Sequence, residues 1–230
     1  MDRALKLCFD ADGTVLDISG RHHRVYARTI RLLGGKPLTK RAYWQLRRRD
    51  TEWSRILVES GLKPELSSAF LRGFIELIES PDMLATDRLV VGGEASLRRL
   101  SDHHCLYLVS LRRSRGDLME ELDRLRIGKY FDSVTVGHTD AVAYRSKVEL
   151  IGRIPGFNDG IVIGDTEADI LAAKELSLMS VAVLSGIRGI EYLRPLKPDF
   201  IVGGIRDVPR LIDGLMFRRG GSSVDRGDRL

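Results

Sequence analysis

The sequence predicts an α/β fold: a doubly wound parallel sheet with a small all-helical domain inserted after the first strand. Short apolar runs that alternate with stretches of helical period predict the sheet and its covering helices. From about residue 18 to about residue 83 this alternation stops, and helical periodicity without a convincing strand predicts the insert. We therefore expect a core of residues 1–17 and 84–217, a helical insert of 18–83 and a disordered tail of 218–230.

Each predicted element follows from a local pattern. The first strand is the apolar run Leu5–Phe9, which ends at a polar turn. In the insert, helical periods separated by glycine or proline breaks predict helices at His22–Leu33, Lys40–Arg48, Glu52–Ser60 and Pro64–Ile78. After the insert, apolar runs predict strands at Cys105–Ser110, Ser133–Val136, Gly160–Ile163, Ser180–Leu184 and Phe200–Val202. The helices predicted between and after them are Glu94–Leu100, Leu118–Leu125, Val148–Arg153, Ile170–Leu176 and Val208–Met216.

The composition is typical of a soluble globular protein: 230 residues, of which 43% are hydrophobic and 30% are charged, enough for one full domain and a small second one. No apolar stretch reaches the length of a membrane span, and no long apolar run follows Met1, so we expect neither a membrane segment nor a signal peptide. Cys8 and Cys105 each lie in an apolar, strand-like segment. We expect both thiols to be buried and reduced, and the location to be cytoplasmic.

The chain is basic, with a net charge of +5 and a pI near 9.3, which draws it towards anions such as phosphorylated metabolites or nucleic acid. Much of the excess lies in the arginine runs Arg47–Arg49, Arg112–Arg113 and Arg218–Arg219, without the interleaved aromatic residues that single-strand binding uses. We expect solvated faces to account for most of this charge, and no nucleic-acid partner.

The motif Asp10-Ala11-Asp12-Gly13-Thr14 directly follows the first predicted strand. Asp10 is placed to attack phosphorus as a nucleophile, and Asp12 to protonate the leaving alkoxide and later to deprotonate a water molecule. Gly13 allows a sharp turn, and Thr14 can hydrogen-bond the loop. The alternative is an aspartate-rich turn after an edge strand, without a chemical role.

A second acidic segment, Gly164 to Asp169, follows another predicted strand. The carboxyl ends of parallel strands share one edge of a sheet, so the two acidic segments would repel each other unless a divalent cation lay between them. We predict a Mg²⁺ site formed by the side chains of Asp10, Asp12, Asp165 and Asp169. For Asp169 an alternative stays open, because Thr166 and Asp169 also form a helix capping box.

Ser110 and Lys147 lie between the acidic segments in sequence. The Ser110 hydroxyl and the backbone N–H of Leu111, at the end of a strand, can reach a phosphate oxygen. Ser146 and Glu149 form a capping box that places Lys147 in the first turn of a helix. An ammonium group is unfavourable there unless it reaches an anion. The whole pattern predicts a phosphoryl-transfer site.

The order DxDGT, Ser, Lys, GDxxxD resembles the haloacid-dehalogenase-like (HAD) superfamily over roughly residues 5–215. The resemblance implies a Rossmann-like core, Mg²⁺ and an aspartyl-phosphate intermediate, with Asp10 as nucleophile and Asp12 as acid/base. It also implies phosphate binding by Ser110 and Lys147, and a helical cap formed by the insert. The chain departs from phosphoglycolate-phosphatase-like members at Leu111, where they usually carry Asn, and at Val148, where Pro is frequent.

The expected activity is hydrolysis of a small phosphorylated metabolite by a monomer or homodimer. Candidate specificity residues are Arg112 and Arg113, next to Ser110, and His22 and His23, at the start of the first insert helix. A phosphomutase with the same residues is the near alternative. A 2-haloacid dehalogenase is disfavoured by Asp12, and a basic nucleic-acid-binding module is a further alternative of another class.

Overall fold

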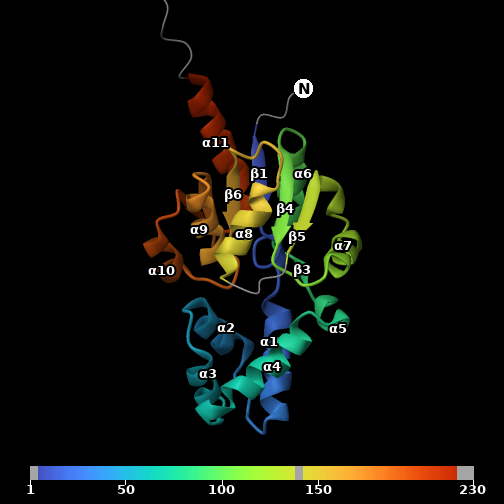
Figure 1. Cartoon of the computed structure of the whole chain (residues 1–230), viewed down its shortest axis with the longest axis vertical. Helices are drawn as coiled ribbons and strands as arrows, with labels where there is room; N and C mark the ends of the chain where they lie inside the picture. Colours follow the sequence, from blue (N-terminus) through green and yellow to red (C-terminus); the bar gives the residue numbers. More distant parts are fainter. Residues whose placement is uncertain (1–4, 138–141, 222–230) are drawn as a thin grey trace, which may run out of the picture.

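The computed structural model describes residues 5–137 and 142–221, which form an α/β core and a smaller helical body beneath it in Figure 1. The core contains a six-stranded parallel sheet of order β5-β4-β1-β6-β7-β8. Its strands are β1 (Lys6–Phe9), β4 (Cys105–Ser110), β5 (Ser133–Val136), β6 (Ile161–Gly164), β7 (Met179–Val183) and β8 (Phe200–Val202). The predicted α/β fold class is thereby confirmed.

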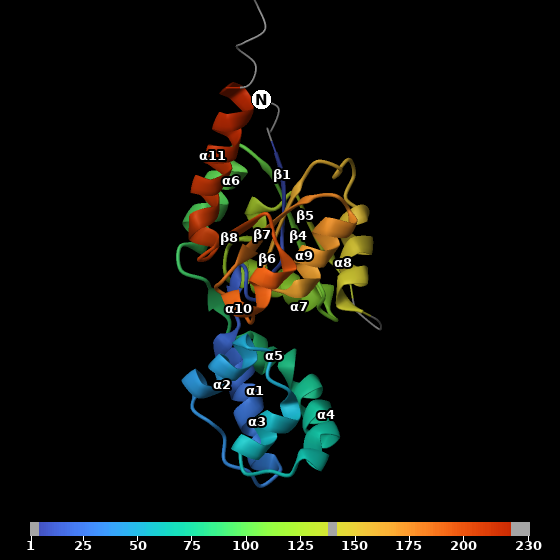
Figure 2. The ribbon, with the colours of Figure 1, turned by 90° about the vertical axis from the view of Figure 1, so that its left-hand side faces the viewer.

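Helices cover both faces of the sheet. They are α6 (Gly93–Ser101), α7 (Arg115–Arg124), α8 (Ala143–Gly152), α9 (Glu167–Glu175), α10 (Ile190–Leu193) and α11 (Val208–Gly221). Alternate side chains of β1 serve the two faces: Leu7 and Phe9 pack in one cluster with α6, α7 and α11, and Cys8 packs in another with α8 and α9. Figure 2 shows α6 and α11 on one side of the sheet and α8 and α9 on the other. This wrapping leaves the carboxyl ends of β1 and β6 directed towards the helical body.

The helical body, called the helical module below, consists of α1 (Ser19–Leu32), α2 (Lys40–Arg48), α3 (Trp53–Glu59), α4 (Ser67–Ile78) and α5 (Pro81–Leu84). Its core is aromatic: Tyr26 stacks on Tyr43 with ring centroids 4.2 Å apart, and Trp53 packs against Phe70 at 4.9 Å. Two short antiparallel strands, β2 (Leu16–Asp17) and β3 (Arg88–Leu89), join the module to the core. Short 3-10 turns lie at Pro64–Leu66, Gly128–Tyr130, Arg194–Leu196 and Ile205–Asp207.

Several local predictions need correction. The short helix α5 was not predicted: α4 ends at Ile78 and Pro81 is the first residue of α5, a position where proline is favourable because an N–H there would have no acceptor within the helix. The pairing of β2 with β3 was not predicted, since two-residue strands carry no periodicity. Helix α11 extends to Gly221, so residues 218–221 of the predicted disordered tail are helical. Residues 222–230 of that tail lie outside the described residues.

Helix α8 begins at Ala143, five residues before the predicted start at Val148. Lys147 therefore lies in the second turn, and the predicted capping box of Ser146 and Glu149 is wrong because Val142 occupies the N-cap. Both cysteines are free, although only Cys8 is fully buried and Cys105 is half-buried. Within the described part of the chain, no helix has the length and apolar character needed to traverse a bilayer.

Candidate active site

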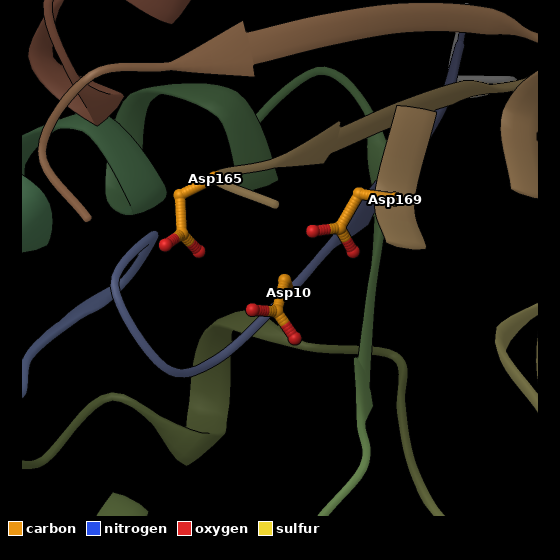
Figure 3. A group of neighbouring side chains, drawn as sticks. All are labelled: Asp10, Asp165 and Asp169. Atoms are coloured by element: carbon orange, nitrogen blue, oxygen red, sulfur yellow. The ribbon is translucent and has the colours of Figure 1, made fainter. Parts of the chain in front are cut away.

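Three carboxylates meet at the carboxyl edge of the sheet. Asp10 directly follows β1 and Asp165 follows β6, and these two strands are parallel neighbours. Asp169 comes from the first turn of α9. One carboxylate oxygen from each of the three lies within 4.8 Å of the others, and Figure 3 shows the side chains turned towards one another. These residues, called the aspartate group below, are separated by up to 159 positions in sequence and are brought together by the sheet.

Lys147 lies inside the aspartate group. Its Nζ donates to Asp10 Oδ1 at 2.5 Å and to Asp169 Oδ1 at 2.6 Å. Asp169 has two functions, because its other oxygen, Oδ2, accepts from the backbone N–H of Thr166 at 3.1 Å and from the Thr166 hydroxyl at 2.7 Å. The capping interaction and the contact with Lys147 thus use different oxygens of one carboxylate.

The electrostatics of the aspartate group favour an additional cation. Burial raises the pKa of Asp10 to about 7, helped by the nearby Asp169 and opposed by Lys147. Burial also raises the pKa of Asp165 well above its usual value, with Asp10 and Asp169 adding to the rise. Three carboxylates and one ammonium leave an excess of two negative charges when all are ionised. Carboxylate oxygens are the ligands that Mg²⁺ and Ca²⁺ prefer, so the donor set fits a hard divalent cation.

The turn after Asp10 is built against Asp165. Gly13 has a φ of +87°, and a Cβ on it would lie 2.4 Å from Asp165 Oδ2, so only glycine fits. The Thr14 hydroxyl donates to Asp165 Oδ1 at 3.1 Å. The turn therefore fixes both its own shape and the direction of the Asp165 carboxylate.

Asp12, predicted as a fourth metal ligand, does not join the aspartate group. Its carboxylate accepts a hydrogen bond from Arg21 Nη2 at 2.7 Å. It also accepts two from Arg112, one from Nε at 3.1 Å and one from Nη2. Arg112 is itself bound by Glu121 at 2.6 Å. Burial alone would raise the pKa of Asp12, but Arg21 and Arg112 together pull it below the usual range.

Two further predicted site residues occupy the strand end. Ser110 is the last residue of β4, is 2% exposed, and accepts from the Gly137 N–H through its carbonyl oxygen. Leu111 follows it and packs partly buried against the cluster that contains Cys8. Their roles in phosphate binding stay predictions.

The four predicted specificity residues make contacts within the protein. Arg112 is 2% exposed and occupied by protein carboxylates, and Arg113 reaches across to the helical module, where it contacts Glu79 and the Ile75 carbonyl. His22 packs between Trp44 and Phe74, and burial lowers its pKa to about 3. His23 packs against Tyr26 and Tyr43 and contacts the Leu38 carbonyl at 3.0 Å, inside the module.

Sequence reasoning missed three arginines that join the module to the core: Arg21, Arg48 and Arg188. Arg48 belongs to a run that we expected to be solvated, yet it is half-buried and donates to core carbonyls. Arg188 follows the end of β7, at the edge of the sheet where Asp10 and Asp165 lie. The rule that ligand sites lie at this edge could therefore have identified Arg188 from the sequence. Arg21 stands beside the two histidines that were singled out, four positions after the end of β2.

Comparisons with known proteins agree with this architecture. A family model described as HAD-hydrolase-like matches residues 138–208. A phosphoglycolate phosphatase of Synechococcus elongatus is 26% identical over 215 residues, which cover 91% of this chain and 98% of that protein. A haloacid-dehalogenase-like hydrolase of Streptococcus pneumoniae superposes with a TM-score of 0.72 at 20% identity, covering 92% of this chain and 100% of that one. A magnesium-bound HAD-family hydrolase of Bacillus subtilis, for which interdomain movement is described, superposes with a TM-score of 0.61 at 16% identity over 92% of this chain and 100% of that one.

Proposed function

We propose that this chain, which is similar to haloacid-dehalogenase-like hydrolases, is a Mg²⁺-dependent phosphatase of a small phosphorylated metabolite. The observation that carries the proposal is the aspartate group with Lys147 inside it. An oxygen nucleophile, an ammonium group and two further carboxylates at one sheet edge are the parts that phosphoryl transfer by an aspartate needs.

In the proposed reaction, Asp10 attacks phosphorus, the P–O bond to the substrate's alkoxide breaks, and an aspartyl-phosphate forms. Water then hydrolyses this intermediate to inorganic phosphate and the free Asp10 carboxylate. Lys147 holds Asp10 at 2.5 Å and so fixes the direction of its carboxylate. Its positive charge also offsets the charge that develops on the phosphoryl oxygens. Ser110 and the Leu111 N–H, at the neighbouring strand end, bind the phosphate in this proposal.

Asp10, Asp165 and Asp169 are the residues that would hold Mg²⁺, which supplies charge neutralisation for the phosphoryl group when bound. Asp165 is oriented for this by two donors, the Thr14 hydroxyl and the Ile187 N–H at 2.8 Å. Asp12 is the acid/base of the proposal: in its protonated form it would give a proton to the leaving alkoxide. The resulting carboxylate, the form that Arg21 and Arg112 favour, would then take a proton from the attacking water.

The test is turnover of a generic aryl phosphate by the purified protein, measured as release of inorganic phosphate. We expect activity with Mg²⁺, none with EDTA, and poor recovery with Ca²⁺, because its looser coordination does not fix an in-line attack. Asp10→Asn should abolish turnover and leave the circular-dichroism spectrum unchanged. Turnover by that variant at the wild-type rate would contradict the assignment of the nucleophile.

The substrate is then sought among phosphorylated metabolites. Because a curated relative is named a phosphoglycolate phosphatase, 2-phosphoglycolate is the first compound to try. Release of inorganic phosphate, instead of transfer to a second hydroxyl of a sugar phosphate, separates a phosphatase from a phosphomutase.

A further inference from the structure

The loop of residues 184–189, which follows β7, packs directly on the aspartate group. The Ile187 N–H donates to Asp165 Oδ2 at 2.8 Å, and the Ser185 hydroxyl donates to the Gly13 carbonyl at 2.8 Å. A Cβ on Gly186 would lie 1.9 Å from Asp165 Oδ2, so the loop backbone approaches this carboxylate as closely as a chain can. The loop and the Thr14 hydroxyl therefore orient the Asp165 carboxylate together, each through one of its oxygens.

The same loop is held from the other side by the helical module. Arg48, the last residue of α2, donates from Nη1 to the Leu184 carbonyl at 3.0 Å and to the Gly186 carbonyl at 2.7 Å. In return, the Gly189 N–H donates to the Arg48 carbonyl at 2.9 Å. One guanidinium therefore ties two loop carbonyls, including that of the residue nearest to Asp165, to the C-terminus of a module helix.

Arg188 makes the reciprocal connection from the core. Its guanidinium pairs with both oxygens of Glu167 at 2.9 Å, and with Asp50 of the module at 2.6 Å. It also donates at 3.4 Å to the Arg47 carbonyl near the C-terminus of α2, which accepts from the Asp50 N–H as well. Glu167 lies two residues beyond Asp165, so this second connection also ends beside the aspartate group.

These contacts depend on the module being docked. If the module moved away from the core, Arg48 would lose both of its carbonyl acceptors, and the loop would lose its contacts with Arg47, Arg48 and Asp50. Charge-assisted hydrogen bonds of this kind are stronger and more directional than neutral ones. A loop released from them gives the Asp165 carboxylate a less fixed N–H donor.

We propose that residues 184–189 form a latch that couples docking of the helical module to the orientation of Asp165, with Arg48 and Arg188 as positioning residues. The inference rests on the proposed function, because it concerns the residues that would hold Mg²⁺. It predicts that the module, although it contributes no carboxylate to the aspartate group, sets the affinity of the core for the metal.

The test is calorimetric titration of the full chain with Mg²⁺ alone, comparing Arg48→Met with Arg49→Met. Arg48→Met keeps the aliphatic stem and removes the donors, whereas Arg49 is the exposed neighbour in the same run. We expect Arg48→Met to weaken Mg²⁺ binding by at least about threefold, and Arg49→Met to leave it within about 1.5-fold of wild type. Equal Mg²⁺ affinity in Arg48→Met and wild type would overturn the latch.

Tryptophan fluorescence gives an independent measurement, because the two tryptophans of the chain, Trp44 and Trp53, both lie in the helical module. Mg²⁺ should change the fluorescence of the wild type at the concentration where calorimetry shows binding, and Arg48→Met should abolish the change. A wild type that binds Mg²⁺ with unchanged fluorescence would also overturn the proposal.

Asp50→Asn is the second variant should Arg48→Met fail to fold. Asp50 has a φ of +54°, which asparagine tolerates, so the substitution removes the ion pair with Arg188 without straining the backbone. We expect Mg²⁺ binding weakened by about twofold, and wild-type affinity would contradict the latch. Failure of the proposed function looks different, because Asp10→Asn would then turn over substrate or the wild type would bind no Mg²⁺.

Discussion

Two groups of largely buried charged side chains lie beyond the carboxyl end of β1 and differ in how their charge is balanced. The aspartate group has three carboxylates and one ammonium. The second, called the arginine group below, has Asp12, Asp87 and Glu121 around the guanidiniums of Arg21 and Arg112. Burial raises the pKa of Asp10 to about 7, whereas the two arginines hold that of Asp12 below its usual range.

The arginine group comes close to neutrality within the protein itself. Burial raises the pKa of Asp87 to about 8, and a protonated Asp87 leaves two carboxylates for two guanidiniums. In the aspartate group one ammonium serves three carboxylates, and the raised pKa values of Asp10 and Asp165 mean that its charge is offset by protons, which a bound cation would displace. The difference indicates that the arginine group fixes a side chain, whereas the aspartate group is built to receive a cation.

The largest effect is expected when the aspartate group loses its one cation, in Lys147→Met. Removing one partner from a buried ion pair lowers the free energy of unfolding by about 3–5 kcal/mol. Turnover should fall by about a thousandfold, because the ammonium group no longer offsets the negative charge of the phosphoryl group. The measurements are aryl-phosphate turnover and urea denaturation in EDTA and in Mg²⁺. Mg²⁺ should restore more stability to this variant than to the wild type.

The control is Lys174→Met, at an exposed lysine on α9 that contacts the Leu196 carbonyl. It should change neither turnover nor the free energy of unfolding by a measurable amount. Wild-type stability of Lys147→Met in EDTA would mean that the three carboxylates do not need the ammonium, and the contrast between the groups would fail.

A smaller but still large effect is expected in the arginine group. Arg112→Met leaves Asp12 and Glu121 without their shared guanidinium and should lower the free energy of unfolding by about 3 kcal/mol. Arg113→Met is the matched control, because that arginine is 39% exposed and its pair with Glu79 is worth at most about 1 kcal/mol. If Arg112→Met raises KM without loss of stability, the role of Arg112 is to bind substrate, as the sequence suggested. Its pairing with Asp12 would then not stabilise the fold.

An effect of intermediate size is expected in the pH dependence of the free energy of unfolding, which should have opposite signs for the two groups. In the metal-free protein, Asp10 has a folded-state pKa of about 7 against an ordinary value of 3.8. Between these values the folded protein holds a proton that the unfolded chain has released, so stability falls as the pH rises through this window. Asp12 acts in the opposite sense, and its stabilisation is lost as the pH falls below the ordinary value.

Urea denaturation in EDTA between about pH 4 and pH 7 measures this slope. Mg²⁺ should flatten it, because a bound cation favours the ionised carboxylates, and Asp10→Asn should flatten it without Mg²⁺. A slope that is identical in the wild type and Asp10→Asn would show that the raised pKa belongs to other groups.

The same contrast explains what could be predicted from the sequence. The strand ends that carry Asp10 and Asp165 follow from short apolar runs and the rule that parallel strands share a carboxyl edge, so the aspartate group was largely predictable. The capping box of Thr166 and Asp169 was equally local and is present. What the sequence could not give was the partner of Asp12, because Arg112 is 100 positions away and Arg21 lies on a helix whose docking no local pattern encodes.

Charge runs were misleading for a related reason. Arg47 to Arg49 look like one solvated run, but α2 turns by about 100° per residue, so neighbouring side chains meet different surroundings. Arg48 contacts the loop after β7, and Arg47 lies over the Trp53 ring at 4.2 Å. The site is therefore predictable where it depends on strand ends and unpredictable where it depends on how the module meets the core.

The smallest effect is expected from the end of the chain, which belongs to neither group. Figure 1 shows α11 running away from the helical module, so that its last turn lies at the opposite end of the core from the aspartate group. The helix packs on the core through Val208 and Ile212, near its start, while Phe217 is 84% exposed. Deleting residues 222–230 should therefore change aryl-phosphate turnover and Mg²⁺ affinity by less than about twofold, because α11, the last described element, ends away from the helical module. A large loss of turnover in this deletion would show that electrostatics at the site are not set by the two groups alone.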